Sequence, residues 1–313
     1  MLQVIWKRLY REAALLLAFW MPPERKRAFE RRLRGKEEFR KLELADCVIV
    51  SFGKSGRTWV RVLLSRFFQL RYGLGQAAFV GFDNLHRKDE RIPRVFFTHD
   101  NYLRDYTGNL DNRKDFRDKK TVLLMRHPAD VAVSQFFQWK FRMRPHKKGL
   151  NKYPRHGVEV DAFTFVMDRD AGLPKIIDFM NAWSRELPEL KDFLLVRYED
   201  LRADTVGQLR NVLNFMGQNA TDAELRDCVE FASIENMRQL ETKQVFWLAG
   251  SRMRAKDTSN PDSFKVRRAK VGGWRDYFDE KQVAEIERVI EAQLMPGYGY
   301  LKSERASQLA ATA

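Results

Sequence analysis

Residues 51–59, with the sequence SFGKSGRTW, combine glycines, a lysine and hydroxyl side chains at the end of an apolar run. A chain that turns through Gly53 and Gly56 into a helix presents backbone N–H groups to an anion, and Lys54 adds a full charge. These residue types predict a phosphate-binding loop; the alternative is a tight strand-to-helix turn with an incidental lysine. A Walker A motif needs a glycine where Val48 stands, so the loop is P-loop-like in purpose but not in length.

A second anion-binding pattern follows a later apolar run, in the sequence RHPADVAVS of residues 126–134. Arg126 stands at the predicted carboxyl end of a strand, where open α/β sheets bind ligands. Its guanidinium can bind a phosphate bidentately, and the Ser134 hydroxyl, about two helical turns on, can face the same crevice. The alternative is an arginine paired with a carboxylate. Together, the two patterns indicate a ligand with two separate phosphate groups.

Strands and helices that would position these residues alternate along the chain. Apolar runs rich in β-branched and aromatic residues predict strands at 47–52, 94–98, 121–125 and 193–196. Helical patterns cover 58–70, 129–140, 161–186 with a break near 172–174, 205–216, 222–231 and 279–294. Near-continuous apolar strands separated by helices predict a single α/β domain over 44–300, with a mostly parallel central sheet flanked by helices.

The composition is that of a globular protein with an anionic partner. The 313 residues are 44% hydrophobic, which favours an ordinary core over disorder, and 57 Lys+Arg against 42 Asp+Glu leave a net charge of +15. Cys47 and Cys228 cannot form a disulfide framework, so a reducing, cytoplasmic compartment is expected.

The N-terminal segment, residues 1–43, is predicted to be helical, amphipathic and then basic. Its wholly apolar stretch at 13–21 is shorter than the ~20 residues of a membrane span. One interpretation is an amphipathic helix packed on the core and followed by a solvated charged helix. The other is a peripheral membrane contact through residues 1–36. The polar tail, 301–313, is expected to be disordered.

Several segments in order resemble the sulfotransferases that use 3′-phosphoadenosine 5′-phosphosulfate (PAPS). The resemblance runs from Val48 to Phe278. KSGRTW is similar to the family's 5′-phosphosulfate loop, RHPADVAVS to its 3′-phosphate element, and Thr98-His99 to the segment that carries the catalytic histidine. LLVRYEDL, the segment at 232–237 and RRAKVGGWRDYF resemble further nucleotide-binding segments.

The resemblance implies roles for individual residues. His99 is the implied general base, Lys54 would stabilise the leaving oxygen, and Ser134 would hold Lys54 away from that oxygen until the acceptor arrives. The implied PAPS-binding residues are Lys54, Ser55, Gly56, Arg57, Thr58, Trp59, Arg126, Ser134, Tyr198, Ser233, Ile234, Met237, Arg267, Arg268 and Ala269. His86, His127, His146 and His156 are taken as structural.

The chain departs from the family pattern at seven positions within these segments. Arg57 replaces a threonine of the loop, Phe97 stands where many cytosolic members have a lysine, and Ile234 replaces an aromatic residue. Asp100-Asn101 replaces Leu-Pro, and Ala269 and Gly273 replace glycine and aspartate. These changes leave donor binding credible, whereas the acceptor and the oligomeric state stay open.

The implied reaction is in-line transfer of a sulfonyl group from PAPS to a hydroxyl or amine of a small-molecule or lipid acceptor, without a metal. Aromatic side chains would suit an apolar acceptor, unless they are core; the candidates are Phe79, Phe82, His86, Phe136, Phe137 and Trp247. Two other function classes are a magnesium-dependent small-molecule kinase and a non-catalytic binder of nucleic acid or anionic membrane. Nucleic acid is not expected, because a non-catalytic binder leaves the two phosphate motifs and His99 unexplained.

Overall fold

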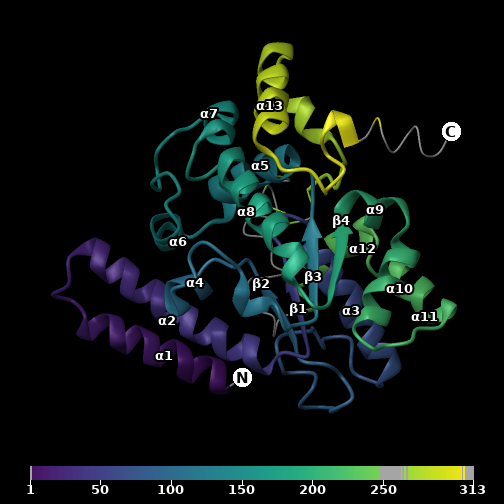
Figure 1. The fold of residues 1–313 in the computed structure, drawn as a ribbon. Coiled ribbons are helices and arrows are strands. Elements are labelled where there is room, and N and C mark those ends of the chain that lie inside the picture. Colours follow the sequence, from purple (N-terminus) through teal and green to yellow (C-terminus); the bar gives the residue numbers. More distant parts are fainter. Residues whose placement is uncertain (1, 247–261, 263, 266, 305, 307–313) are drawn as a thin grey trace.

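A four-stranded parallel sheet forms the centre of the molecule (Figure 1). The computed structural model describes residues 2–246, 262, 264–265, 267–304 and 306. The strand order is β2-β1-β3-β4, and all three neighbouring pairs are parallel, which confirms the predicted fold class. The strands are β1 (Cys47–Val50), β2 (Val95–Thr98), β3 (Thr121–Met125) and β4 (Phe193–Arg197).

Alternating side chains of the sheet enter two separate cores, as expected for a sheet covered on both faces. Ile49, Val122 and Leu124 belong to one core, and Val48, Val50, Leu123 and Met125 to the other. The first core is covered by α3 (Arg57–Arg71), α10 (Thr205–Phe215), α11 (Asp222–Phe231) and α12 (Ile234–Thr242). The second is covered by α5 (Pro128–Phe137), α8 (Leu173–Glu186) and α13 (Glu280–Gln293).

Apart from the two N-terminal helices, the remaining described elements are short. They are α4 (Leu103–Thr107), α6 (Pro145–Leu150), α7 (Ala162–Met167), α9 (Tyr198–Ala203), a π-turn at Gln138–Arg142 and 3₁₀ turns at Lys114–Phe116, Leu187–Glu189 and Gly273–Tyr277. The helix predicted over 161–186 is two helices, α7 and α8. Gly172 lies in the break, where a Cβ atom would come within 2.1 Å of the Val166 carbonyl oxygen.

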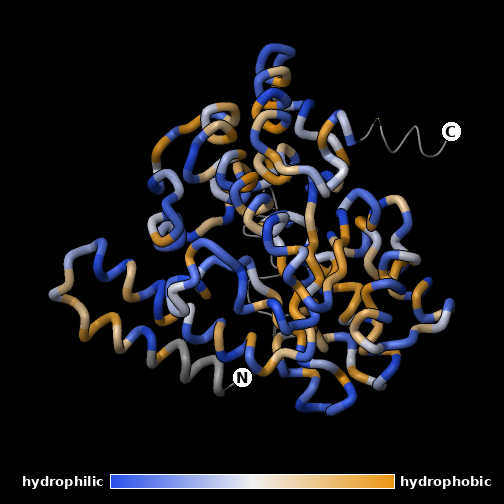
Figure 2. The backbone as a smooth tube through the Cα atoms, in the orientation of Figure 1, coloured by the Kyte–Doolittle hydropathy of each residue, from blue (hydrophilic) through white to orange (hydrophobic). Residues whose placement is uncertain are grey.

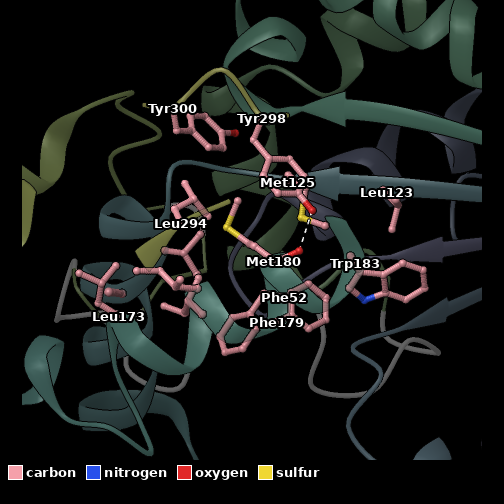
Figure 3. Packing of buried hydrophobic residues seen from close by; sticks show 14 of the residues in the cluster. Phe52, Leu123, Met125, Leu173, Phe179, Met180, Trp183, Leu294, Tyr298 and Tyr300 are labelled. Carbon is pink, nitrogen blue, oxygen red and sulfur yellow. Dashed lines mark hydrogen bonds between the residues drawn. The ribbon is translucent and has the colours of Figure 1, made fainter. Parts of the chain in front are cut away.

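The chain after α13 returns to the second core and closes it (Figure 3). The Tyr298 hydroxyl donates a hydrogen bond of 2.8 Å to the Met180 carbonyl on α8. The Tyr300 hydroxyl donates to Glu199, whose other carboxylate oxygen accepts from the backbone N–H of His127. The C-terminal segment therefore helps to fix the turn that follows β3. Residues 305 and 307–313 of the predicted tail lie outside the described residues.

The N-terminal helices α1 (Leu2–Leu17) and α2 (Pro23–Leu44) form a hairpin that extends from the α/β body (Figure 1). The charged helix α2, rather than the apolar end of α1, packs on the body: Arg31 binds Asp105 of α4 through two hydrogen bonds of 3.1 and 2.9 Å. The expectation of a packed apolar helix followed by a solvated charged helix is therefore wrong. The helix α2 can approach the segment before α4 closely because Gly35 has no side chain: a Cβ atom there would lie 2.2 Å from the Tyr102 carbonyl oxygen.

Candidate active site

The segment 51–56 leaves β1 and turns into α3 through two left-handed residues. Lys54 has φ +77° and Gly56 has φ +94°. Any Cβ atom on Gly56 would lie 2.7 Å from the Tyr198 ring, so the position requires glycine for both its conformation and its space. The helix N-terminus of α3 and the Lys54 side chain consequently face the same cavity, as the predicted phosphate-binding loop requires.

Each of the four strands is followed, at its carboxyl end, by a residue or loop that the sequence predicted to be functional. The sheet register pairs Val50 with Thr98, and Met125 with Arg197. The loop after β1, His99 after β2, Arg126 after β3 and Tyr198 after β4 therefore converge at one edge of the sheet. They line a cavity of about 1290 Å³. This is the place where open parallel sheets bind ligands.

Most of the residues predicted to bind PAPS line this cavity. They are Lys54, Gly56, Arg57, Thr58, Trp59, Arg126, Ser134, Tyr198, Ile234, Met237, Arg267, Arg268 and Ala269, together with His99. Ser55 is buried beneath the loop, and Ser233 lies in a separate, smaller pocket. The Ser233 hydroxyl caps α12 by accepting from the Asn236 backbone N–H at 3.2 Å.

Positive charge is concentrated on the nucleotide side of the cavity. Burial and the nearby guanidinium groups of Arg142, Arg126 and Arg267 lower the pKa of Lys54 to about 7. Burial and Lys54 itself hold the pKa of Lys265 well below its usual value. A polyanion in this part of the cavity would offset that repulsion, so the residues present fit the two phosphate groups of the PAPS nucleotide.

Lys265 and Arg142 are functional candidates that the sequence did not reveal. The only available signal for Lys265 was the Lys- and Arg-rich composition of 244–270, and that signal does not include Arg142. Glu241 on α12, almost fully buried, accepts hydrogen bonds from the Lys265 backbone N–H at 3.0 Å and from Arg142 at 3.1 Å. This carboxylate holds both cations beside Lys54.

The segment with the sequence RRAKVGGW is fastened to α5 by one carboxylate. Asp130 accepts hydrogen bonds from the backbone N–H groups of Gly272 at 2.8 Å and Trp274 at 3.0 Å. Asp130 also lies 3.6 Å from Arg126. Asp130 is nearly inaccessible to solvent, and it therefore anchors the backbone just after Arg267–Ala269 and orients Arg126 at the same time.

His99 is held in one orientation by two partners. Its Nδ1 lies 2.7 Å from the Ser51 carbonyl oxygen, and Arg57 Nη2 lies 2.5 Å from its Nε2. Because a carbonyl only accepts and a guanidinium only donates, these partners assign the proton to Nδ1 and a lone pair to Nε2. Burial and the charge of Arg57 hold the pKa of His99 well below its usual value. The ring is therefore neutral at physiological pH.

Trp59 forms a wall of the cavity beside the loop. Its indole N–H donates to the Ala232 carbonyl at 3.0 Å, and its ring meets Tyr198 edge-on at 5.9 Å. The Arg202 guanidinium lies over the indole, 5.5 Å from its centroid. Trp59 is thus immobilised among Ile234, Met237 and Tyr198, where a flat aromatic base can pack.

The expected aromatic acceptor walls are wrong for every candidate that the structure describes. Phe79, Phe82, His86, Phe136 and Phe137 do not line the cavity. Phe79 packs against Phe246 with ring centroids 4.7 Å apart, and Phe136 belongs to a small core with Trp139 and Phe165. These rings are core because burial removes their large apolar surface from water. Trp247 lies outside the described residues.

Polar side chains line the acceptor side, together with other apolar ones such as Phe97, Leu150 and Phe179. The polar ones come from α2, the 99–102 segment, α6 and the region after α6: Arg31, Glu38, Asp100, Asn101, Tyr102, Lys147, Asn151 and Tyr153. Asp100 is buried, with φ +50°, and its carboxylate lies 2.5 Å from Arg113. The Asp100-Asn101 departure from the family pattern was the one sequence signal of this polarity.

The other four histidines have structural partners. His86 Nδ1 lies 2.8 Å from the Ile92 carbonyl, His127 stacks on Trp274, and His146 Nε2 lies 3.0 Å from a Glu30 carboxylate oxygen. His156 contacts Lys148, and none of the four lines the cavity. Within the described part of the chain, no three His, Cys, Asp or Glu side chains are grouped to hold a metal ion.

The parallel sheet, the phosphate loop after β1 and the cationic cavity define an α/β enzyme that binds a nucleotide with more than one phosphate group. Residues 44–299 match the sulfotransferase domain family, so the chain belongs to the sulfotransferases. It is a PAPS-dependent sulfotransferase.

Relatives of known activity agree with this assignment. Human sulfotransferase 2A1 is 23% identical over 266 residues, which cover 80% of this chain and 84% of that protein. Cytosolic sulfotransferase 13 of Arabidopsis thaliana is 25% identical over 300 residues, covering 88% and 84%.

Two solved structures share the fold. A mouse sulfotransferase in complex with PAP, which covers 88% of this chain and 94% of its own, has a TM-score of 0.55 at 18% identity. Retinol dehydratase in complex with retinol and PAP has a TM-score of 0.55 at 16% identity, covering 83% and 85%.

Proposed function

We propose that this enzyme transfers a sulfonyl group in line from PAPS to a hydroxyl or amine, with His99 as the general base. The observation that carries the proposal is the state of His99: it is neutral, its Nδ1–H is used by Ser51, and Nε2 is its basic atom. The ring lines the same cavity as Lys54 and the phosphate loop. Nε2 can therefore accept the proton of an acceptor that attacks a sulfonyl group held there.

Lys54 and Arg57 supply positive charge at the reacting end. Lys54 would stabilise the oxygen that leaves with the nucleotide, a fixed-charge contribution of the kind that dominates many group transfers. Arg57 donates to Nε2 of His99 and must leave it before that nitrogen can accept a proton. The sulfonate of the donor would offer the guanidinium an anionic partner, and its binding would thereby release the base.

The second phosphate of the nucleotide would be bound where the turn after β3 meets the C-terminal segment. Arg126, Ser134, Arg267, Arg268 and the Ala269 backbone share that side of the cavity. We propose that these groups select the 3′-phosphate. The positive side chains would neutralise the phosphates directly, so the reaction needs no metal. Val48 inside β1 makes the loop too short for a Walker A motif, which disfavours the kinase alternative.

Thermal shift with a panel of nucleotides tests this function. PAPS and PAP should raise the melting temperature, and ATP with or without Mg²⁺ should not, because a ligand that binds only the folded state stabilises it. Turnover should continue in excess EDTA. Adenosine 5′-phosphosulfate should be at least ~10³-fold poorer than PAPS as a donor, because several charge-assisted hydrogen bonds are lost. An enzyme indifferent to the 3′-phosphate, or inactive without Mg²⁺, would contradict the proposal.

We further propose that the enzyme is cytoplasmic and contacts an anionic bilayer through the tip of the N-terminal hairpin. The named plant relative is a cytosolic enzyme, and no helix among the described residues is long and apolar enough to span a membrane. Leu16, Leu17, Phe19 and Trp20 at the tip are 69–79% exposed, and an apolar stretch is visible there (Figure 2). Exposed Arg25 and Arg32 on α2 complement anionic headgroups.

Co-sedimentation with vesicles tests the membrane contact. Phosphatidylglycerol vesicles should retain the protein more strongly than phosphatidylcholine vesicles, and a Phe19→Ser/Trp20→Ser variant should lose this binding. Val158→Ser, at another exposed apolar position, is the matched control. Unchanged binding by the double variant would remove the hairpin tip from the contact.

A further inference from the structure

Helix α2 brings one carboxyl group into the acceptor side of the cavity. Glu38 lies before residue 44, outside the part of the chain that matches the sulfotransferase domain. It lines the cavity together with His99, Asp100 and Tyr102. The sulfotransferase domain alone therefore does not complete the acceptor side of this cavity, and α2 contributes a chemical group to it.

The Glu38 carboxyl is buried and only partly hydrogen-bonded. A backbone hydrogen bond from Tyr102 reaches it, whereas its Oε2 is inaccessible to solvent and has no hydrogen-bond partner among the residues that the structure describes. Unpartnered buried oxygens are unusual, because they lose the hydrogen bonds of water without replacement. Because the Glu38 side chain also lines the cavity, a rotation of its carboxyl group would bring this oxygen to a substrate group that can supply the missing partner.

The surrounding charges leave Glu38 able to donate as well as accept. Burial and the neighbouring Asp100 carboxylate raise its pKa to about 7, against the lowering effects of Lys41, Tyr102 and Arg57. Near neutral pH the carboxyl therefore carries a proton part of the time. A protonated carboxyl donates one hydrogen bond and accepts others, which is the capacity of a hydroxyl group as well.

The charged groups around Glu38 also suit a neutral polar ligand, although apolar side chains such as Phe97, Leu150 and Phe179 line the cavity as well. The charged groups are largely paired among themselves: Arg31 with Asp105, and Asp100 with Arg113. Asn101 adds an amide that can both donate and accept, and the mixed signs of charge favour neither a cation nor an anion. An apolar ligand would leave Glu38 Oε2 without a partner. Binding sites strongly reject ligands that leave a buried polar group of the site unpaired.

We propose that Glu38 binds the acceptor and that the acceptor is a polyhydroxylated molecule, either a free sugar or polyol or the sugar headgroup of a lipid. This inference rests on the proposed function. The acceptor oxygen forms the new S–O bond, the S–O bond to the nucleotide phosphate breaks, and the acceptor proton passes to Nε2 of His99. Glu38 holds a neighbouring hydroxyl of the same molecule and thereby orients the attacking one.

Sulfonation of four probes by the full chain, with radiolabelled PAPS, tests the proposal. The probes are methyl glucoside, octyl glucoside, 1-naphthol and a detergent-solubilised sterol. At least one glucoside should be used at least ~10-fold better than the phenol and the sterol. Glu38→Ala should lower kcat/KM for that glucoside ~10- to 100-fold, because a hydrogen bond to a carboxyl is lost. Glu38→Gln should lie between the parent and Glu38→Ala.

Glu37→Gln is the matched control, because Glu37 is the next residue of α2 but bonds to Lys41 and does not line the cavity. It should match the parent. Every variant should keep the parent's PAP-induced rise in melting temperature, which also verifies folding. A preference for octyl over methyl glucoside would identify a lipid headgroup, and equal use a free sugar.

Preference for the phenol or the sterol, use of neither glucoside, or parental activity in Glu38→Ala would overturn the acceptor assignment. If PAP failed to stabilise the parent enzyme, the donor assignment itself would fail, which keeps the two outcomes distinct.

Discussion

The two sides of the cavity are formed by different kinds of chain segment and differ in charge. The nucleotide side is made largely by residues that directly follow the strands, such as the loop at 51–56 and Arg126, and it carries an excess of positive charge. The acceptor side is made by α2, the 99–102 segment, α6 and the region after α6, and it carries both signs of charge. Short local motifs thus define the nucleotide side, whereas the acceptor side depends on segments that meet only in the folded protein.

Burial has opposite effects on the ionisable groups of the two sides. On the nucleotide side, burial and neighbouring cations lower the pKa of Lys54 to about 7. On the acceptor side, burial and Asp100 raise the pKa of Glu38 to about 7. The nucleotide side has an excess of positive charge for which a polyanion is the natural partner. On the acceptor side, positive and negative side chains are largely paired with each other, as Asp100 is with Arg113.

The largest expected effect lies where the two sides meet, at His99. His99→Ala should reduce turnover by ~10²–10⁴-fold, because the general base is lost. PAP affinity, measured by calorimetry, should change little, since His99 faces the acceptor proton. His86→Ala, which removes a histidine outside the cavity, should retain parental turnover. Parental turnover in His99→Ala would show that another group takes the proton.

A smaller effect, on nucleotide binding, should distinguish the loss of contacts to the 3′-phosphate from general damage to the fold. Arg126→Ala should weaken PAP binding ~10- to 100-fold, because charge-assisted hydrogen bonds to the 3′-phosphate are lost. Binding of adenosine 5′-phosphate, which lacks that group, should barely change. Calorimetry at one fixed salt concentration gives both dissociation constants, with Arg210→Ala, a surface arginine paired with Asp222, as control. Equal losses for both nucleotides would place Arg126 outside the 3′-phosphate site.

The smallest effect is a change in pH dependence from the contact between Arg57 and His99. Burial and then the charge of Arg57 lower the pKa of His99. Arg57→Thr removes that charge, so the pKa of His99 should rise toward its usual value. Because the base works only when neutral, the acid limb of kcat/KM should move to higher pH. Arg57→Lys keeps the charge and should keep the limb near its parental position; coincident profiles for all three proteins would exclude this coupling.

The strands and the donor motifs could be predicted because their signals are local. The strand expected at 121–125 is β3 itself, and the one expected at 47–52 is only two residues longer than β1. A buried parallel strand is an apolar run of fixed direction, and its carboxyl end is known once the run is found. That is why Lys54, His99 and Arg126 could be placed at one edge of the sheet before any coordinates were known.

The acceptor side could not be predicted, because its members are brought together over long chain separations. Glu38 reaches the cavity only because α2 packs on α4, and Arg31 of the same helix binds Asp105. Periodicity predicted the helix but not the surface that it covers. Aromatic residues such as Phe79 were equally compatible with the core and with a substrate wall, and close packing against Phe246 decided between the two.

Sequence alone thus determined the parallel α/β fold and the order of the strand-end motifs, and it predicted a ligand with two phosphate groups. Tertiary structure decided which cations share the cavity: Glu241 places Lys265 beside Lys54 from more than 200 residues away in the chain. It also decided which carboxyl faces the acceptor. The physical reason is that backbone geometry and strand direction are set by neighbouring residues, whereas burial, charge repulsion and unpaired oxygens arise only when distant segments pack together.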